Sequence, residues 1–154
     1  MLNYKSVISL PECIGNLTSL THLDLRENQL TCLPDSIGSL IFQTRLIASN
    51  NQLTLLPDSI GSMTSLAHLD LNANQLTRLP DSIGNLIFLG YLDVGSNQLT
   101  HLPDSIGNLE HLGSLNVRKT PSHQRRKVQA KFMAALVDPG CICSCNFIVL
   151  FSYN

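Results

Sequence analysis

The sequence predicts an α/β solenoid, shaped as a horseshoe, with a parallel β-sheet on its concave face and short helical or 3-10 turns on its convex face. Two observations support this prediction. A pattern of 23 residues recurs without insertion from the first residues to about Lys119, and repeats of this length are typical of solenoids. Within each copy, apolar and polar residues alternate over a short segment, which indicates a strand with one buried face.

The most regular copies of the pattern occupy residues 20–42, 66–88 and 89–111, and a degraded copy occupies residues 43–65. Each follows the pattern L-x-x-L-x-L-x-x-N-x-L-x-x-L-P-D-S-I-G-x-L-x-x. The residues before the first copy fit the second half of an earlier repeat, and a last, partial repeat follows the fourth copy. We therefore predict a repeat array over residues 1–119.

Each predicted strand places its leucines on one side, as with Leu23 and Leu25. Because equivalent points lie 23 residues apart, successive strands run parallel. Parallel sheets usually have both faces covered, whereas this alternation leaves one face polar. A solenoid reconciles the two observations, because one face of its sheet packs on the return segments and the other lines an open concave surface.

Two residue types recur at fixed positions after each strand. A proline fixes φ at the start of each return segment, and the Asp-Ser that follows it suits the start of a short helical turn. An asparagine amide can satisfy backbone groups left unpaired where the chain leaves a sheet. We predict that four such side chains form a structural ladder, namely Asn28, Asn51, Asn74 and Asn97.

These leucines and the central asparagine resemble those of the leucine-rich repeat family. The L-P-D-S-I-G segment, as at residues 33–38, is similar to that of Ras-suppressor and Shoc-like cytosolic scaffolds and of plant intracellular Ras-group-related proteins. The resemblance covers residues 2–119. It implies a horseshoe fold and a protein-binding role, and it makes a small GTPase or a kinase a plausible partner.

The composition narrows the class of protein. A net charge of −1 gives the chain no bulk attraction for nucleic acid. No stretch approaches the roughly 18 consecutive apolar residues that span a bilayer, and residues 1–20 lack the features of a signal peptide. The odd count of five cysteines, with Cys13 and Cys32 at variable repeat positions, does not suggest a disulfide framework. We expect a cytoplasmic protein with no nucleic-acid partner and no transmembrane segment.

We expect function on the concave face, where polar strand residues form columns across neighbouring repeats. Strands lie about 4.8 Å apart, so a ribbon of roughly five strands is large enough for one protein contact of ordinary size. The predicted partner-binding residues are His22, Asp24, Arg26, Glu27, Arg45, Ile47, His68, Asp70, Asn72, Tyr91, Asp93, Asn116 and Arg118.

The same face gives little indication of catalysis. His22 and Asp24, like His68 and Asp70, lie two residues apart, but no nucleophile converges on them and the surface is open to water. Arg45 intervenes between the two histidines, which argues against a metal site. The sequence contains no glycine-rich phosphate loop. We therefore predict a protein that is not an enzyme and that needs no metal or cofactor.

The repeats are not identical. Gln43 and Ala48 take leucine positions in the second copy, which we predict to be the weakest layer. Thr-Ser precedes the first and third strands, whereas Ile-Phe precedes the second and fourth, which indicates duplication of a 46-residue pair. We expect Phe42 and Phe88 to be partly buried between return segments rather than to form apolar spots on the convex side.

The composition changes beyond Lys119. We predict a capping helix at residues 120–140, and a basic helix that binds membranes or calmodulin is the alternative. Residues 141–154 form a cysteine-rich hydrophobic tail of uncertain order. Its C-x-C-x-C segment lacks the second cysteine pair of a persuasive zinc site, and lipidation is a further alternative. Because the chain begins in mid-repeat, we expect a fragment or truncated relative of a longer protein.

These observations predict a non-catalytic protein-interaction module, an intracellular signalling adaptor that binds a protein partner on its concave face. Two alternatives stay open. One is a detached recognition or regulatory segment of a larger multidomain enzyme or immune receptor. The other is an extracellular repeat protein.

Overall fold

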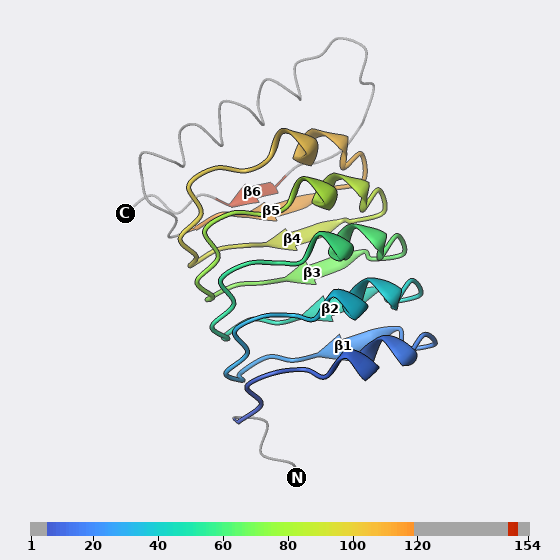
Figure 1. The fold of residues 1–154 in the computed structure, drawn as a ribbon. Coiled ribbons are helices and arrows are strands. Elements are labelled where there is room, and N and C mark those ends of the chain that lie inside the picture. Colours follow the sequence, from blue (N-terminus) through green and yellow to red (C-terminus); the bar gives the residue numbers. More distant parts are fainter. Residues whose placement is uncertain (1–5, 119–147, 151–154) are drawn as a thin grey trace.

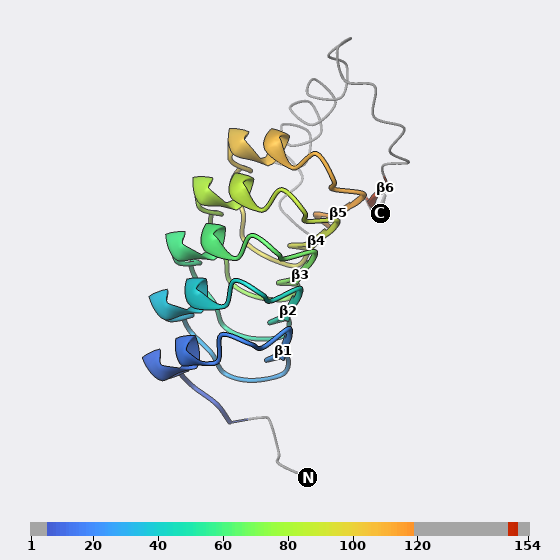
Figure 2. The same cartoon turned by 90° about the vertical axis from the view of Figure 1, so that its right-hand side faces the viewer.

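The computed structural model describes residues 6–118 and 148–150. It confirms the predicted fold class, because the repeats stack into a solenoid with a parallel sheet on one face and short 3-10 helices on the other (Figure 1, Figure 2). The strands are β1 (His22–Asp24), β2 (Arg45–Ile47), β3 (His68–Asp70), β4 (Tyr91–Asp93), β5 (Ser114–Asn116) and β6 (Ile148–Leu150). The 3-10 helices are η1 (Glu12–Asn16), η2 (Asp35–Ser39), η3 (Asp58–Ser62), η4 (Asp81–Asn85) and η5 (Asp104–Asn108).

The sheet follows the order of the sequence, and its register follows the repeat. All neighbouring strands pair in parallel. His22 lies opposite Arg45, which lies opposite His68, so residues 23 positions apart are neighbours across the sheet. The polar columns that the sequence predicts on the concave face are therefore columns in space.

The sixth strand comes from the C-terminal tail rather than from a repeat. β6 pairs with β5, with Ile148 opposite Ser114. The predicted capping helix at residues 120–140 lies outside the described residues, as does the tail from residue 141 apart from this strand.

A continuous core of leucine and isoleucine lies between the sheet and the 3-10 helices. The central strand residues Leu46, Leu69 and Leu92 have no exposed surface, and Ile60 and Ile83 of η3 and η4 are equally buried. Each fully buried side chain of this kind contributes about 1.5–3 kcal/mol. Most of that burial requires the neighbouring repeats, so the array folds only as a stack.

The 3-10 helices pack so closely that only small residues fit between them. A Cβ atom on Gly61 would lie 2.4 Å from the backbone oxygen of Ser82 in the next repeat, and one on Gly38 would lie 2.5 Å from that of Ser59. These distances are far below van der Waals contact. The recurring Ser-Ile-Gly segment is therefore a packing requirement, in which each glycine accommodates the serine of the following repeat.

The predicted asparagines lie where the chain leaves the sheet, and they join successive repeats. Nδ2 of Asn74 donates to the carbonyl of Leu71 at 3.0 Å and to that of Ala48, in the preceding repeat, at 2.9 Å. Its Oδ1 accepts a backbone N–H of the preceding repeat at 3.0 Å. Asn51 and Asn97 make the same three bonds. The amides thus pair backbone groups that the turn takes out of the sheet.

The degraded second repeat carries a polar group in the core. Gln43 and Ala48 are both fully buried. Nε2 of Gln43 donates to the carbonyl of Arg45 at 2.6 Å, whereas its Oε1 is buried and has no hydrogen-bond partner among the described residues. The glutamine that replaces leucine at this repeat position is therefore energetically unfavourable, because it buries an acceptor without a partner.

The expectation that Phe42 and Phe88 are partly buried between return segments is wrong, because both side chains are mainly exposed, at 58% and 54%. Each lies in a two-residue turn that joins a 3-10 helix to the next strand. A hydrogen bond from the backbone N–H of Gln43 to the carbonyl of Leu40, 3.0 Å long, closes the first of these turns. Residues at the centre of such a turn sit on the surface, so the repeat position exposes these rings whatever their hydrophobicity.

Candidate functional site

The concave face presents two polar columns, because the central leucine of each strand points into the core and the residues on either side of it point outward. The structure brings the thirteen predicted residues onto this face, in the strands or within three residues after them. Their accessibility differs widely. Ile47 and Asp93 are only 6% and 8% exposed, so neighbouring side chains cover most of what a partner would otherwise contact there.

A rigid aromatic cluster lies at the middle of the face. The rings of His68 and Tyr91 stack with their centroids 4.3 Å apart and an interplanar angle of 4°. The hydroxyl of Tyr91 donates to Oδ2 of Asp93 at 3.2 Å. Stacking on one side and a hydrogen bond at the tip hold the tyrosine in one orientation, so little conformational entropy remains to be lost when a partner binds.

The carboxylate of Asp93 holds this cluster in place through hydrogen bonds to its neighbours. Its Oδ1 accepts the backbone N–H of Gly95 at 2.9 Å and Nδ2 of Asn72 at 3.1 Å. Its Oδ2 accepts Nδ2 of Asn116 at 2.9 Å in addition to the bond from Tyr91. The buried carboxylate is therefore supported by four donors, as a buried charge must be.

The cluster perturbs the ionisation of both aromatic rings. Burial raises the pKa of the Tyr91 phenol, and the adjacent negative charge of Asp93 raises it further. Burial lowers the pKa of the His68 imidazole, and the positive charge of Arg45 acts in the same direction. Near neutral pH both rings are therefore uncharged, and the cluster presents apolar ring surface together with polar edges.

The N-terminal part of the face is more open and carries opposite charges. Asp24 and Arg26 form an ion pair of 2.7 Å with both side chains about half exposed. The hydrogen bond from Arg26 holds the pKa of Asp24 below its ordinary value. Arg45 stands beside this pair at a shallow hollow of about 270 Å³. The hollow is lined by His22, Leu23, Asp24, Arg26, Arg45 and Ile47.

Glu27 and Arg118, at the two ends of the concave face, are also exposed. Glu27 has a positive φ of 57°, as do the equivalent residues of the next three repeats, which turn the chain out of the sheet. Arg118 follows β5, and its backbone N–H donates to Oδ1 of Asn116 at 3.0 Å. These residues lie at the ends of the ribbon and extend its charged surface.

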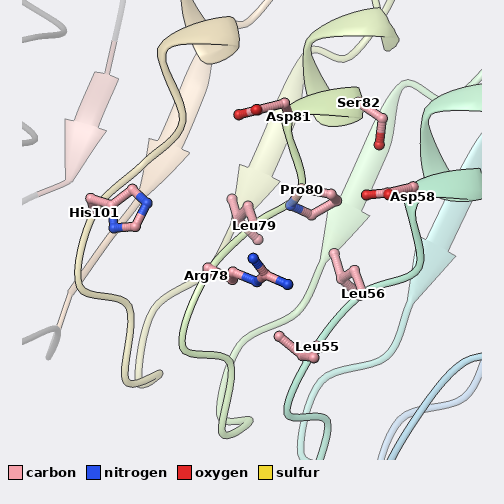
Figure 3. Close-up of a pocket in the computed structure, with 9 residues that line it drawn as sticks. All are labelled: Leu55, Leu56, Asp58, Arg78, Leu79, Pro80, Asp81, Ser82 and His101. Atoms are coloured by element: carbon pink, nitrogen blue, oxygen red, sulfur yellow. The ribbon is translucent and has the colours of Figure 1, made fainter.

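Sequence reasoning missed a larger hollow of about 560 Å³ on the side of the solenoid (Figure 3). Arg78 lies there between Leu55 and His101 of the adjacent repeats, with Asp58 and Asp81 at the rim. A signal was available in the sequence. In the segment N-Q-L-T-x-L-P-D-S-I-G only the x position differs between copies, and this position supplies Arg78, Leu55 and His101.

The two histidine–aspartate pairs that lie two residues apart, on β1 and β3, make other contacts. Nδ1 of His22 lies 2.9 Å from Oγ1 of Thr21, and Asp24 bonds with Arg26. His68 stacks on a ring instead of contacting Asp70. Among residues 6–118 and 148–150, no group of three or more histidine, cysteine or acidic side chains could hold a metal ion.

Two remaining observations are the state of the described cysteines and the absence of a membrane-spanning helix in the described residues. Cys13 and Cys32 are exposed free thiols. In the part of the chain that the structure describes, no helix has the length and hydropathy of a membrane span.

A solenoid of parallel strands and 3-10 helices, with an asparagine ladder and an open polar concave face, defines a class of protein-binding repeat proteins. Two family models identify the class further. One, described as a leucine-rich repeat region, matches residues 1–75, and another, the leucine-rich repeat itself, matches residues 65–86 and 88–109. The chain belongs to the leucine-rich repeat family. Proteins of this family are generally non-catalytic binding modules.

Solved structures agree with this assignment. The chain is similar to a leucine-rich repeat protein of Leptospira interrogans, with 33% identity and a TM-score of 0.69 over 80% of this chain and 33% of that one. It is similar to the plant peptide hormone receptor RGFR1 in complex with RGF2, with 35% identity and a TM-score of 0.68 over 75% of this chain and 19% of the receptor.

A third similar structure is the functional domain of InlJ from Listeria monocytogenes, with 26% identity and a TM-score of 0.63 over 74% of this chain and 25% of that one. The chain thus spans a third or less of the length of these three structures. A sequence search of the curated proteins finds no match.

Proposed function

We propose that the chain is an interaction module that binds a protein partner through its concave face. The observation that carries this proposal is the preorganised cluster of His68, Tyr91 and Asp93 at the centre of that face. Tyrosine is enriched among the residues that dominate binding energy, and a tyrosine already fixed in position loses little freedom on binding. The charged residues at the N-terminal end flank this cluster and orient the partner.

We propose further that the module acts as a signalling adaptor in the cytoplasm. The L-P-D-S-I-G segment, as at residues 33–38, resembles that of Ras-suppressor and Shoc-like scaffolds. That resemblance suggests a small GTPase or a kinase as the partner. The exposed thiols of Cys13 and Cys32 are compatible with a reducing compartment.

A second function is favoured by one comparison. The similar plant protein is a peptide hormone receptor in complex with RGF2, and this chain spans 19% of its length. On this alternative, the repeats are the recognition segment of a larger receptor or enzyme, and the ligand is a peptide. The same concave face would bind it, so the two functions differ in what is bound rather than where.

Affinity capture tests the proposal with three baits: the wild type, a concave variant and a lateral variant. The concave variant combines Tyr91→Ala with Asp70→Lys, and the lateral control is Arg78→Glu. We expect the wild type and the control to retain the same protein, identified by mass spectrometry, and the concave variant to lose it. Equal capture by all three folded baits contradicts binding on the concave face. A retained peptide in place of a folded protein supports the receptor alternative.

A further inference from the structure

The turns that join each 3-10 helix to the following strand line up along one edge of the solenoid (Figure 1). Each has two central residues, which are Thr18-Ser19 before β1, Ile41-Phe42 before β2, Thr64-Ser65 before β3, Ile87-Phe88 before β4 and Glu110-His111 before β5. We call this row the turn edge. The concave face and the lateral hollow are formed by other residues, so the turn edge is a separate surface.

Small polar and bulky apolar pairs alternate over the first four turns of the turn edge, and the fifth turn carries Glu110-His111. Phe42 and Phe88 are 58% and 54% exposed, and the isoleucines before them, Ile41 and Ile87, are 45% and 48% exposed. Large apolar side chains that are half exposed and close together are unusual on a monomer surface and mark an interaction site. The two Ile-Phe pairs match each other in both composition and exposure.

This alternation makes the turn edge complementary to itself. In an interface with two-fold symmetry, a residue that contacts a second residue is contacted by it in turn. With the two-fold axis between the turns before β2 and β3, Ile41-Phe42 of one copy faces Thr64-Ser65 of the other. Ile87-Phe88 then faces Thr18-Ser19. Every bulky pair meets a small pair, and no two bulky pairs collide.

The spacing of the rings fits the same arrangement. Strands lie about 4.8 Å apart, so Phe42 and Phe88, two repeats apart, are separated by roughly 10 Å. A third ring fits between them, because aromatic centroids pack at about 4.5–7 Å. The axis described above places Phe42 of the second copy there. An axis between the turns before β3 and β4 is excluded, because it sets Ile41-Phe42 against Glu110 and so presses a carboxylate onto apolar side chains.

We propose that the chain forms a weak two-fold dimer through the turn edge, in which each Ile-Phe pair enters the Thr-Ser gap of a second copy. If each phenylalanine loses the exposed half of its roughly 200 Å², four rings bury about 400 Å². The isoleucines and the small turn residues add to this area, and the total stays in the range of transient interfaces, below about 1,200 Å². The dimer therefore dissociates on dilution and leaves the concave face of each copy free.

Sedimentation equilibrium of the full chain, under reducing conditions and over a wide range of concentration, tests this proposal. We expect reversible dimerisation of the wild type, and dimerisation weaker by roughly tenfold or more in Phe42→Ser and in Phe88→Ser, since truncation of central interface residues has effects of this size. Leu55→Ser is the matched control, because Leu55 is also an exposed apolar residue, at 44%, but lies at the lateral hollow. It should dimerise like the wild type.

Two further variants test the position of the axis. Ser65→Asp introduces a charge opposite Phe42 of the second copy and should abolish dimerisation, whereas Glu110→Lys, at the turn before β5, should leave it unchanged. Phe42, Leu55, Phe88 and Glu110 are exposed and Ser65 is partly exposed, so the variants should keep nearly the melting temperature of the wild type. A wild type that is monomeric at every concentration overturns the proposal, as does a dimer that tolerates Phe42→Ser or Ser65→Asp.

Discussion

The buried glutamine of the second repeat allows a stability prediction whose size can be derived from the structure. Gln43→Leu restores the residue that other repeats carry at this position, where Leu66, Leu89 and Leu112 have no exposed surface. The substitution removes the buried Oε1, which has no partner among the described residues. A buried unsatisfied acceptor is unfavourable by about 1–3 kcal/mol.

Two other contributions enter the balance. A fully buried leucine contributes about 1.5–3 kcal/mol, of which the methylene groups of Gln43 already provide a part. The substitution also breaks the 2.6 Å hydrogen bond from Nε2 to the carbonyl of Arg45, which costs about 1 kcal/mol. We therefore expect Gln43→Leu to raise the free energy of unfolding by about 2 kcal/mol, and the melting temperature by about 6 °C for a chain of this size.

Thermal and urea unfolding followed by circular dichroism provide the measurement. The urea midpoint should rise with an unchanged slope. Gln52→Leu is the control, because Gln52 is exposed, and it should leave the midpoint where it is. Gln43→Met, which keeps the unbranched shape, guards against a local misfit of leucine. If both core variants behave like the control or are less stable than the wild type, the polar group of Gln43 is not the weak point of the repeat.

Three further predictions follow from the packing and the ionisation of single residues. Ala48→Leu should raise the melting temperature by filling space in the leucine core, and an unchanged or lower value would mean that the core is already full there. Gly61→Ala should lower the free energy of unfolding by about 1–3 kcal/mol, because the added Cβ would lie 2.4 Å from the backbone oxygen of Ser82. Gly90→Ala, whose Cβ has 3.7 Å of space, should have a much smaller effect in the same urea titration. Burial lowers the pKa of His68 below its ordinary value of 6.5, so its contribution to stability is complete above about pH 6.5 and decreases as the pH falls below it. An NMR titration should give a value below 6.5, and His68→Gln should lessen the loss of stability between about pH 7.5 and pH 5.5.

The features that every repeat shares were predictable from the sequence. Leu69, Asn74 and Pro80 recur at fixed positions because each repeat needs the same buried strand residue, backbone partner and turn. A periodic requirement leaves a periodic signal. The short strand β6 has no such signal, because Ile148–Leu150 belongs to no repeat, and no pattern in the sequence indicated that it pairs with β5.

The accessibility of single positions was less predictable. Period-two alternation shows which way a strand residue points, but not how much of it its neighbours cover. Ile47 points outward and is nevertheless 6% exposed. Phe42 shows the opposite outcome, because its place at the centre of a tight turn exposes a residue whose hydrophobicity suggested burial. In both cases tertiary neighbours or turn geometry, rather than residue type, determine the exposed surface.

One polar column shows why equivalent repeat positions are not equivalent sites. Asp24, Asp70 and Asp93 occupy the same position, yet Asp24 is half exposed and paired with Arg26, whereas Asp93 is 8% exposed and accepts four hydrogen bonds. The difference arises two residues further along, where the first repeat has Arg26 and the fourth has Gly95. Reversing the charge of all three aspartates would therefore combine a surface change with damage to a buried network. A variant at Tyr91 and Asp70 disturbs the fold less, because neither side chain belongs to the leucine core and Asp93 keeps three of its four donors when the Tyr91 hydroxyl is removed.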